Sequence, residues 1–462
     1  MYLFISLFIL VISFLLFKNV AGSMSLFKLN LISIIFYIYL VLLSFIGAVL
    51  VVYNLDNHYF VSRFADDHIR FYGWASVLYT MIALPLGIHV SRVVLKIKSP
   101  KYAFEKYMLS PTINSFSYHD SHLKFPLYLM TFISMFAIVY IYSKLGTIPL
   151  IHILQNEDVL SFAQLRHEAQ YGEFGGRLGF YMFLIASKGT PILTYIACAY
   201  WLKSKRKVDF IWLVGLLILC LASVFYGMSK SPFLKLFLGF PVLYIMMRGK
   251  LNIKKTLFVL VISVFIIMCA YTLLMGFSFS LTHFSEYNTG IAGRMIFGQI
   301  AGLFGSFYVF PDVHPFIGFN SVLPGFLNPS PSEHSTRILM YCLNPKGVEM
   351  GIAGAMSSLF IADAWACCGL SGLIIFPFYV GFLIGSFYFL FLKYIKKTPL
   401  ILGLYAYLCF HLPFDSINTF IYDRKTLIPI LMLMAAYLFG KMSRVRYSLL
   451  TRQKPGFFKV YF

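Results

Sequence analysis

Long apolar runs alternate with short polar segments along this chain. Hydrophobic residues fill 60% of its 462 positions, and the mean hydropathy is +0.80. A helix of roughly 20 apolar residues is long enough to cross the hydrocarbon core of a bilayer. The pattern predicts eleven membrane spans, at Met1–Phe17, Leu29–Val52, Phe71–Val90, Phe125–Tyr142, Leu178–Leu202, Phe210–Tyr226, Pro232–Met247, Thr256–Met275, Leu370–Leu392, Leu400–Pro413 and Leu427–Gly440.

These spans predict an all-α, polytopic integral membrane protein that forms one unit over residues 1–462. Two stretches, 147–177 and 276–369, are far longer than ordinary connections between helices, and we expect them to be large loops on the outer face. The second contains two apolar runs, Ile291–Phe310 and Ile352–Cys368, each interrupted by glycine or charge. If outer-loop segments re-enter the bilayer, the number of membrane helices rises from 11 to at most about 14.

Lysine and arginine are sorted by side when the spans are threaded with the amino terminus outside. Of the 38 Lys and Arg, 25 fall on the inner side together with only three of the 17 acids, which gives 25 − 3 = +22 there and 13 − 14 = −1 for the rest. Cytoplasmic loops of membrane proteins carry such an excess of Lys and Arg. The net charge of +21 therefore orients the protein, and we expect no nucleic-acid partner.

Cysteines and paired carboxylates give little sign of a metal. The seven cysteines lie in or beside spans at irregular spacing and include no C-x-x-C pair. Such spacing indicates neither a disulfide framework nor a zinc site. Asp66 and Asp67 are adjacent, but no further ligand pattern accompanies them. We expect neither a metal nor a cofactor.

Cationic residues are few outside the basic loops, which makes each a candidate for anion binding. A guanidinium group can donate two parallel hydrogen bonds to a phosphate. A loop arginine can equally be solvated or face lipid headgroups. The candidates are Arg166 and Arg177 in the first large loop, Arg294 and Arg337 in the second, and Lys230 between two spans.

Lys188 is unusual because it lies inside the predicted span Leu178–Leu202. A charged residue at this depth costs at least ~2.5 kcal/mol on insertion scales unless it reaches an interface or a polar cavity. Gly189 and Pro191 favour a local helix break that would line such a cavity. Lys188 is therefore a candidate cavity residue, with snorkelling or pairing to helix carbonyls as the alternative.

Proton-transfer candidates lie in the same outer loops. Transfer of a sugar from a phosphate leaving group to a hydroxyl needs a base near the acceptor and positive charge near the departing phosphate. Glu333 and His334 stand next to two hydroxyl residues and Arg337 within five positions of a proline-framed loop. Isolated pairs such as His167 with Glu168 are weaker candidates. Glu333 and His334 are therefore the stronger candidates for proton transfer, and the base is one of them if the resemblance described below holds.

Short motifs in the second large loop resemble a known family. Ten residues separate Arg294 from Gly305, Val322–Phe326 combines proline with an aromatic residue, and Gly354–Phe360 is rich in small residues. With many spans and two large outer loops, of which the later is larger, these motifs resemble the O-antigen and repeat-unit polymerases of bacterial surface polysaccharide, the Wzy family. The first loop departs from the pattern, because glycines follow Arg166 one or two positions early.

The resemblance implies a GT-C-like glycosyltransferase of the bacterial inner membrane, with its amino terminus periplasmic and its carboxyl terminus cytoplasmic. Its substrate would be oligosaccharide repeat units linked to undecaprenyl diphosphate, which it would polymerise at the periplasmic face, next to a flippase and a chain-length regulator. The alternatives are an O-antigen ligase, which delivers the chain to lipid A core, and a polysaccharide or lipid transporter. Residues expected to bind the diphosphate are Arg166, Arg177, Arg294, Arg337, Lys230 and Lys188.

Overall fold

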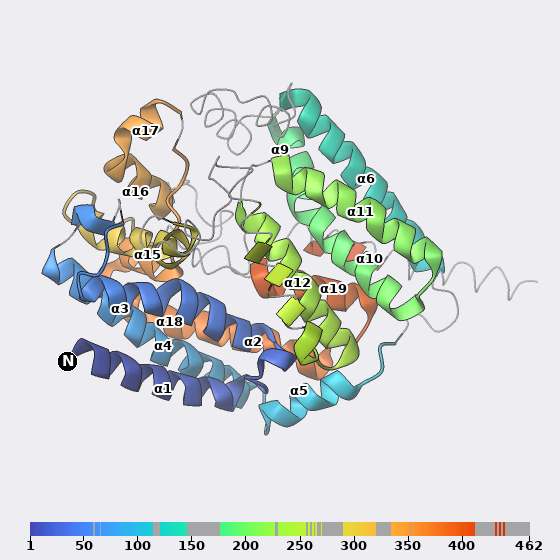
Figure 1. The fold of residues 1–462 in the computed structure, drawn as a ribbon, viewed down its shortest axis with the longest axis horizontal. Coiled ribbons are helices and arrows are strands. Elements are labelled where there is room, and N and C mark those ends of the chain that lie inside the picture. The colour runs from blue at the N-terminus through green and yellow to red at the C-terminus, as the bar shows by residue number, and fades with distance from the viewer. Residues whose placement is uncertain are drawn as a thin grey trace, which may run out of the picture.

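The computed structural model describes residues 1–58, 61–64, 66–113, 121–145, 176–226, 230–255, 290–319, 334–351 and 353–411, with isolated positions between 257 and 438. Every regular element in these segments is a helix (Figure 1). In chain order they are α1 (Tyr2–Val20), η1 (Leu26–Lys28), α2 (Leu31–Ile34), η2 (Ile35–Phe45), α3 (Ile46–Val52), η3 (Val61–Phe64), α4 (Asp67–Val94), α5 (Pro100–Leu109), α6 (Ser121–Leu145), α9 (Gly176–Leu184), η4 (Ile185–Gly189), α10 (Thr190–Ser204), α11 (Lys207–Tyr226), α12 (Lys230–Arg248), α15 (Ile291–Val309), α16 (Ser335–Leu343), α17 (Pro345–Glu349), α18 (Phe360–Tyr394) and α19 (Pro399–His411).

Eight helical segments within the described residues are long and apolar enough to cross a membrane. They coincide with eight of the predicted spans, and α19 matches a ninth as a shorter apolar helix. Only isolated positions of the predicted spans Thr256–Met275 and Leu427–Gly440 belong to the described residues. The described part of the chain thus confirms an all-helical protein of the multi-pass membrane type, whereas the total of eleven spans stays a prediction.

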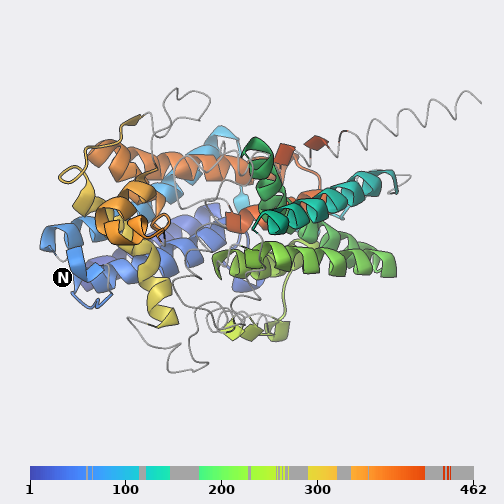
Figure 2. The same cartoon turned by 90° about the horizontal axis from the view of Figure 1, so that it is seen from above.

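The helices form two groups (Figures 1 and 2). The first is built around α4 and α18, with α1, α3, η2 and α15 packed beside them, and the second around α10, with α11, α12 and α19. Tyrosine hydroxyls connect the two groups. The Leu31 N–H donates to the Tyr405 hydroxyl at 3.0 Å, and the Tyr39 hydroxyl donates to the Phe410 carbonyl at 3.1 Å. Buried side chains from both groups belong to one continuous hydrophobic core.

A sharp bend divides α18 at Gly369, whose φ of 56° and ψ of −137° interrupt the helix. The bend frees the carbonyls of Ala366 and Cys367, which accept hydrogen bonds from the N–H groups of Ile317 at 2.9 Å and Gly318 at 3.0 Å. Carbonyls that lose their helical donors need such partners when they are buried. The span predicted to start at Leu370 therefore begins directly after this bend.

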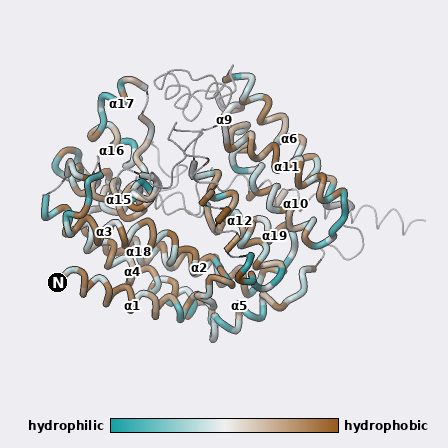
Figure 3. Tube along the Cα trace, in the orientation of Figure 1, coloured by the Kyte–Doolittle hydropathy of each residue, from teal (hydrophilic) through white to brown (hydrophobic). Residues whose placement is uncertain are grey.

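The basic loops meet at one end of the molecule. The Leu251 N–H donates to the Phe27 carbonyl at 3.0 Å, and the Ile113 N–H donates to the Lys397 carbonyl at 2.9 Å. Figure 3 shows apolar positions along the helices and hydrophilic positions concentrated at helix ends and near α5. Contacts of this kind join segments that the charge pattern assigned to a single side, namely those near residues 22–28, 95–113, 202–206, 248–255 and 395–398.

Candidate functional site

The end opposite the basic loops carries the described residues of the second large loop. There, α15 packs against η3, α3, α4 and α16, and α16 also contacts α18. Figure 1 shows α15, α16 and α17 as a layer beside the first helix group. The helix α15 covers most of the apolar run Ile291–Phe310, and its buried side chains contact protein. This layer therefore holds candidate residues against the membrane helices.

Arg294 lies in the first turn of α15, close to His58. The Arg294 N–H donates to the Gly290 carbonyl at 3.0 Å, which starts the helix. His58 is only 3% exposed, and its ring lies 5.9 Å from the ring of Phe297. Burial, followed by the positive charge of Arg294, lowers the pKa of the His58 imidazole to about 4. His58 is therefore neutral near pH 7 and does not compete for this site as a second cation.

A buried ion pair fixes the loop that carries His58. Arg70 in α4 forms a salt bridge with Asp56, and the two side chains are 7% and 0% exposed. The same guanidinium donates to the Val51 carbonyl at 2.6 Å, which links the end of α3 to α4. Breaking a buried pair by removing one partner typically costs about 3–5 kcal/mol. The position of His58 beside α15 therefore depends on two residues that the sequence did not single out.

The start of α16 combines an exposed histidine with a bonded hydroxyl. His334 immediately precedes the helix and its side chain is exposed. The buried hydroxyl of Ser335 donates to the Asp363 carboxylate at 2.8 Å, which ties α16 to the first turns of α18. This hydrogen bond fixes the start of α16, beside which the imidazole of His334 is exposed.

Arg337, one turn further along α16, contacts the main chain. Its guanidinium donates to the carbonyls of Ala353 at 3.2 Å and Gly354 at 3.1 Å. It also lies 4.8 Å from the ring of Tyr341, over its face. Arg337 thus holds residues 353–354 against α16, a structural function that the phosphate-binding prediction did not include.

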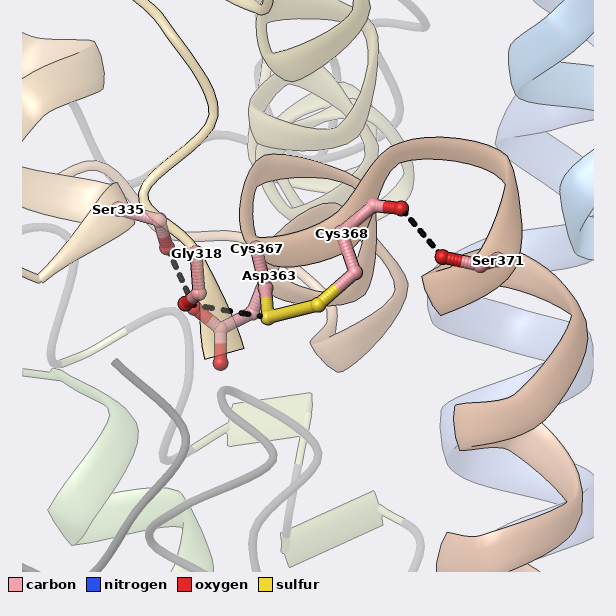
Figure 4. The surroundings of a disulfide bond; sticks show 6 residues. All are labelled: Gly318, Ser335, Asp363, Cys367, Cys368 and Ser371. Atoms are coloured by element: carbon pink, nitrogen blue, oxygen red, sulfur yellow. Dashed lines mark hydrogen bonds between the residues drawn. A yellow bond between two sulfur atoms is a disulfide. The ribbon is translucent and has the colours of Figure 1, made fainter. Parts of the chain in front are cut away.

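A disulfide between two adjacent residues lies next to the hydrogen bond from Ser335 to Asp363. Cys367 and Cys368 are joined just before the bend of α18, and Figure 4 shows them beside the hydrogen bond from Ser335 to Asp363. The sequence predicted no disulfide framework, because the seven cysteines are irregularly spaced. The start of α16 and the bend of α18 therefore meet at one place.

Lys188 lies in the second helix group, in η4, a π-helical turn between α9 and α10. The helix break predicted at Gly189 and Pro191 does not occur. Instead, the Thr190 N–H reaches back to the Ile185 carbonyl and the helix continues into α10. The Ala186 carbonyl accepts a hydrogen bond from the Ser223 hydroxyl. Single π turns are frequent at functional sites, so the widened turn keeps Lys188 a candidate without a break.

Two lysines from other helices lie near His411. The charges of Lys188 and of Lys235, on α12, both act on the imidazole of His411 at the end of α19. All three side chains are half-buried. The two lysine charges, from two helices, make this cluster a second place where an anion would be stabilised.

Sequence reasoning missed His58, Lys235 and His411. A signal existed for Lys235, because it lies inside the predicted span Pro232–Met247 and the reasoning that selected Lys188 applies to it equally. No comparable signal marks His58, since only folding brings it to Arg294.

Four predicted site residues fall outside what the structure describes. Glu333 and Arg166 lie in undescribed segments. Arg177 and Lys230 belong to α9 and α12, but their side chains are not described.

The carboxylates considered for a metal have local structural functions. Asp66 precedes α4 and accepts a hydrogen bond from the His68 N–H at 3.1 Å, and Asp67 lies in the first turn. Both positions are favourable for acids at a helix start. Within the described residues, no group of three or more His, Cys, Asp or Glu side chains is arranged to hold a metal.

Comparisons with protein families, with curated proteins and with solved structures found no match. The described site therefore has to be interpreted from its own chemistry. Guanidinium and ammonium groups on the side opposite the basic loops suit a phosphate-bearing ligand, and the exposed His334 suits proton transfer.

Proposed function

We propose that this protein is a glycosyltransferase of the bacterial inner membrane that polymerises oligosaccharide repeat units linked to undecaprenyl diphosphate. The main support is the position of Arg294 in the first turn of α15, near the buried His58, on the side away from the basic loops. A guanidinium group can donate two parallel hydrogen bonds to a diphosphate. The motifs that resemble the Wzy family include the same arginine.

The reaction can be written with residues in defined roles. Arg294 holds the diphosphate of the growing chain, and Lys188, Lys230, Arg166, Arg177 and Arg337 are further candidates for that contact. His334 or Glu333 takes the proton from an acceptor hydroxyl of the incoming unit. The bond from the sugar to the diphosphate breaks as the new glycosidic bond forms, which releases undecaprenyl diphosphate and leaves the longer chain on the incoming lipid. Positive charge at the leaving group stabilises the transition state.

Two other functions are consistent with some of these cationic and histidine residues. An O-antigen ligase would use the same cations and base but deliver the chain to lipid A core. A transporter would need polar groups distributed through many spans, and the cluster of Lys188, Lys235 and His411 is the described feature closest to that requirement.

An assay with the full chain in liposomes separates these functions. We expect a synthetic lipid-diphosphate repeat unit to be converted into a polymer ladder, and the ladder to persist in excess EDTA because arginine neutralises the diphosphate. Transfer to added lipid A core, with no ladder, would establish the ligase. Movement of the lipid across the bilayer without new linkages would establish a transporter. Activity abolished by EDTA and restored by Mg²⁺ would refute the arginine mechanism.

A further inference from the structure

We propose that a basic groove between α1, α4 and α5 binds the phosphate headgroup of an anionic phospholipid in the leaflet on the basic side. The groove has a volume of about 800 Å³ and contains five cationic residues, Lys18, Lys28, Arg92, Lys98 and Lys101. It lies where the end of α1 meets α5 (Figure 1). The proposal does not depend on the proposed glycosyltransferase activity, because the groove is at the end opposite Arg294.

Positive charge exceeds negative charge in the groove, whose lining holds five cationic residues and one acidic residue, Glu105. The salt bridges Arg70–Asp56 and Lys124–Asp209 both lie outside the groove. Five cations drawn together from three chain segments repel one another. An anion in the groove would relieve that repulsion, and a membrane that is rich in anionic lipid supplies one.

Hydroxyl donors line the same groove. Ser23, Ser25 and Ser99 each accept a hydrogen bond from a backbone N–H, at 3.2, 3.3 and 3.2 Å respectively. No described acceptor takes the O–H proton of any of them, so all three can donate to phosphate oxygens.

The start of α5 adds a third favourable feature. This ten-residue helix begins at Pro100 with no acidic residue in its first turn, and Lys101 lies there instead. A helix amino terminus favours negative charge, so a cation at this position is unfavourable until an anion binds.

The walls of the groove are fixed by hydrogen bonds. Arg92 donates to the carbonyls of Ile97 at 3.1 Å and Lys98 at 2.9 Å, which holds the turn before α5. On the other wall, the Asn30 amide donates to the Ser23 carbonyl at 2.8 Å. Basic residues that only orient a protein in the membrane need no fixed arrangement. The hydrogen bonds described here hold the cationic side chains around a concave site.

An exposed apolar stripe points to a lipid as the source of the phosphate. Along α1, Phe4, Leu7, Val11 and Phe14 are 77%, 50%, 59% and 37% exposed at helical spacing. Phe14 also lines the groove. Acyl chains can therefore lie along α1 while their headgroup occupies the groove. A soluble phosphate has no acyl chain to contact this stripe.

The test is native mass spectrometry of the purified full chain in detergent with cardiolipin, phosphatidylglycerol or phosphatidylcholine added separately. We expect cardiolipin and phosphatidylglycerol to bind, and phosphatidylcholine to bind weakly. The combined variant Lys18→Gln, Lys28→Gln and Lys98→Gln should bind the anionic lipids at least ~tenfold more weakly. A matched control removes three exposed charges elsewhere on the basic side, Arg206→Gln, Lys207→Gln and Lys254→Gln, and should bind as the unmodified chain does.

The outcomes are distinct. Equal losses in the two triple variants would show a diffuse basic surface and overturn the site. If millimolar inorganic phosphate or glycerol 3-phosphate abolishes lipid binding, the groove belongs to a soluble phosphate compound. That result would overturn the proposal that its ligand is a phospholipid. Unchanged melting temperatures of both variants establish that lost binding is not lost folding. If the groove variant melts lower, Lys101→Gln alone, on the first turn of α5, replaces it and must still weaken binding.

Discussion

At the scale of single residues, Arg294 and Arg337 have different surroundings. Arg337 donates to two main-chain carbonyls and lies over Tyr341, so its removal should loosen the 353–354 segment. Arg294 lies beside a neutral histidine in a first helical turn. Substitutions at Arg337 should therefore lower stability, and substitutions at Arg294 should lower activity.

The Arg294 prediction concerns the shape of the cation. Arg294→Lys should fail almost as badly as Arg294→Ala, because an ammonium group cannot reproduce the two-pronged contact with a diphosphate. Loss of one such contact typically costs ~3 kcal/mol, on the order of a hundredfold in rate. Polymer ladders in a strain that lacks the native enzyme measure this, with membrane levels checked. Arg206→Lys is the control, and a normal ladder from Arg294→Ala would remove the residue from the site.

His58 should make stability depend on pH. Its pKa is lowered from 6.5 to about 4 by burial and then by Arg294, so the unfolded chain binds a proton at a higher pH than the folded chain does. Stability should be unaffected above pH ~6.5 and should fall between pH ~6.5 and ~4, by at most about 3 kcal/mol. Thermal unfolding in detergent across this range tests the prediction.

Two variants separate the effect of His58 from that of other histidines. His58→Phe preserves an aromatic ring beside Phe297 and should flatten the pH dependence. His334→Gln changes an exposed histidine and should leave the dependence as it is. Identical curves for the unmodified protein and His58→Phe would contradict the assignment.

At the scale of elements, α4 and α18 depend on glycine to approach each other. A Cβ on Gly87 would overlap the Phe378 carbonyl, and a Cβ on Gly381 would overlap the Leu84 carbonyl. Small residues at such positions let helix backbones pack closely in membranes. The contact between the two helices is therefore set by the absence of side chains at these points.

Enlarging either glycine should separate this pair of helices. Gly87→Val and Gly381→Val should each lower the thermal midpoint, by at least the ~1–3 kcal/mol that overpacking of a core typically costs. Gly215→Val is a matched control on α11, because nothing lies within 4 Å of the added Cβ. Equal midpoints for the three variants would show that the interface relaxes at no cost.

At the scale of the whole molecule, the two ends differ in chemistry. One end contains the basic loops and the basic groove between α1, α4 and α5. The other holds α15, α16 and the loop of His58. This polarity is what a protein needs if it is anchored to a leaflet at one end and acts on a lipid-linked substrate at the other.

Reporter fusions test the orientation. Alkaline phosphatase, which is active only outside the cytoplasm, should be active when fused after Arg337 and inactive when fused after Lys207. The excess of Lys and Arg near residue 207 gives the physical reason. A reversed result at either position would invert the assignment of the site to the outer face.

The sequence by itself determined the helical architecture, the grouping of basic loops and the candidate status of Arg294, Arg337, His334 and Lys188. The length of an apolar run and the number of charges in a loop are local properties of the sequence. In a bilayer they decide the helical architecture, because each backbone N–H and C=O group needs a hydrogen-bond partner within the helix. Only the tertiary structure decided which neighbours these residues have. The position of His58 beside Arg294, the carbonyls bound by Arg337 and the convergence of three basic segments on one groove all arise from contacts between distant parts of the chain, which packing selects and local sequence does not encode.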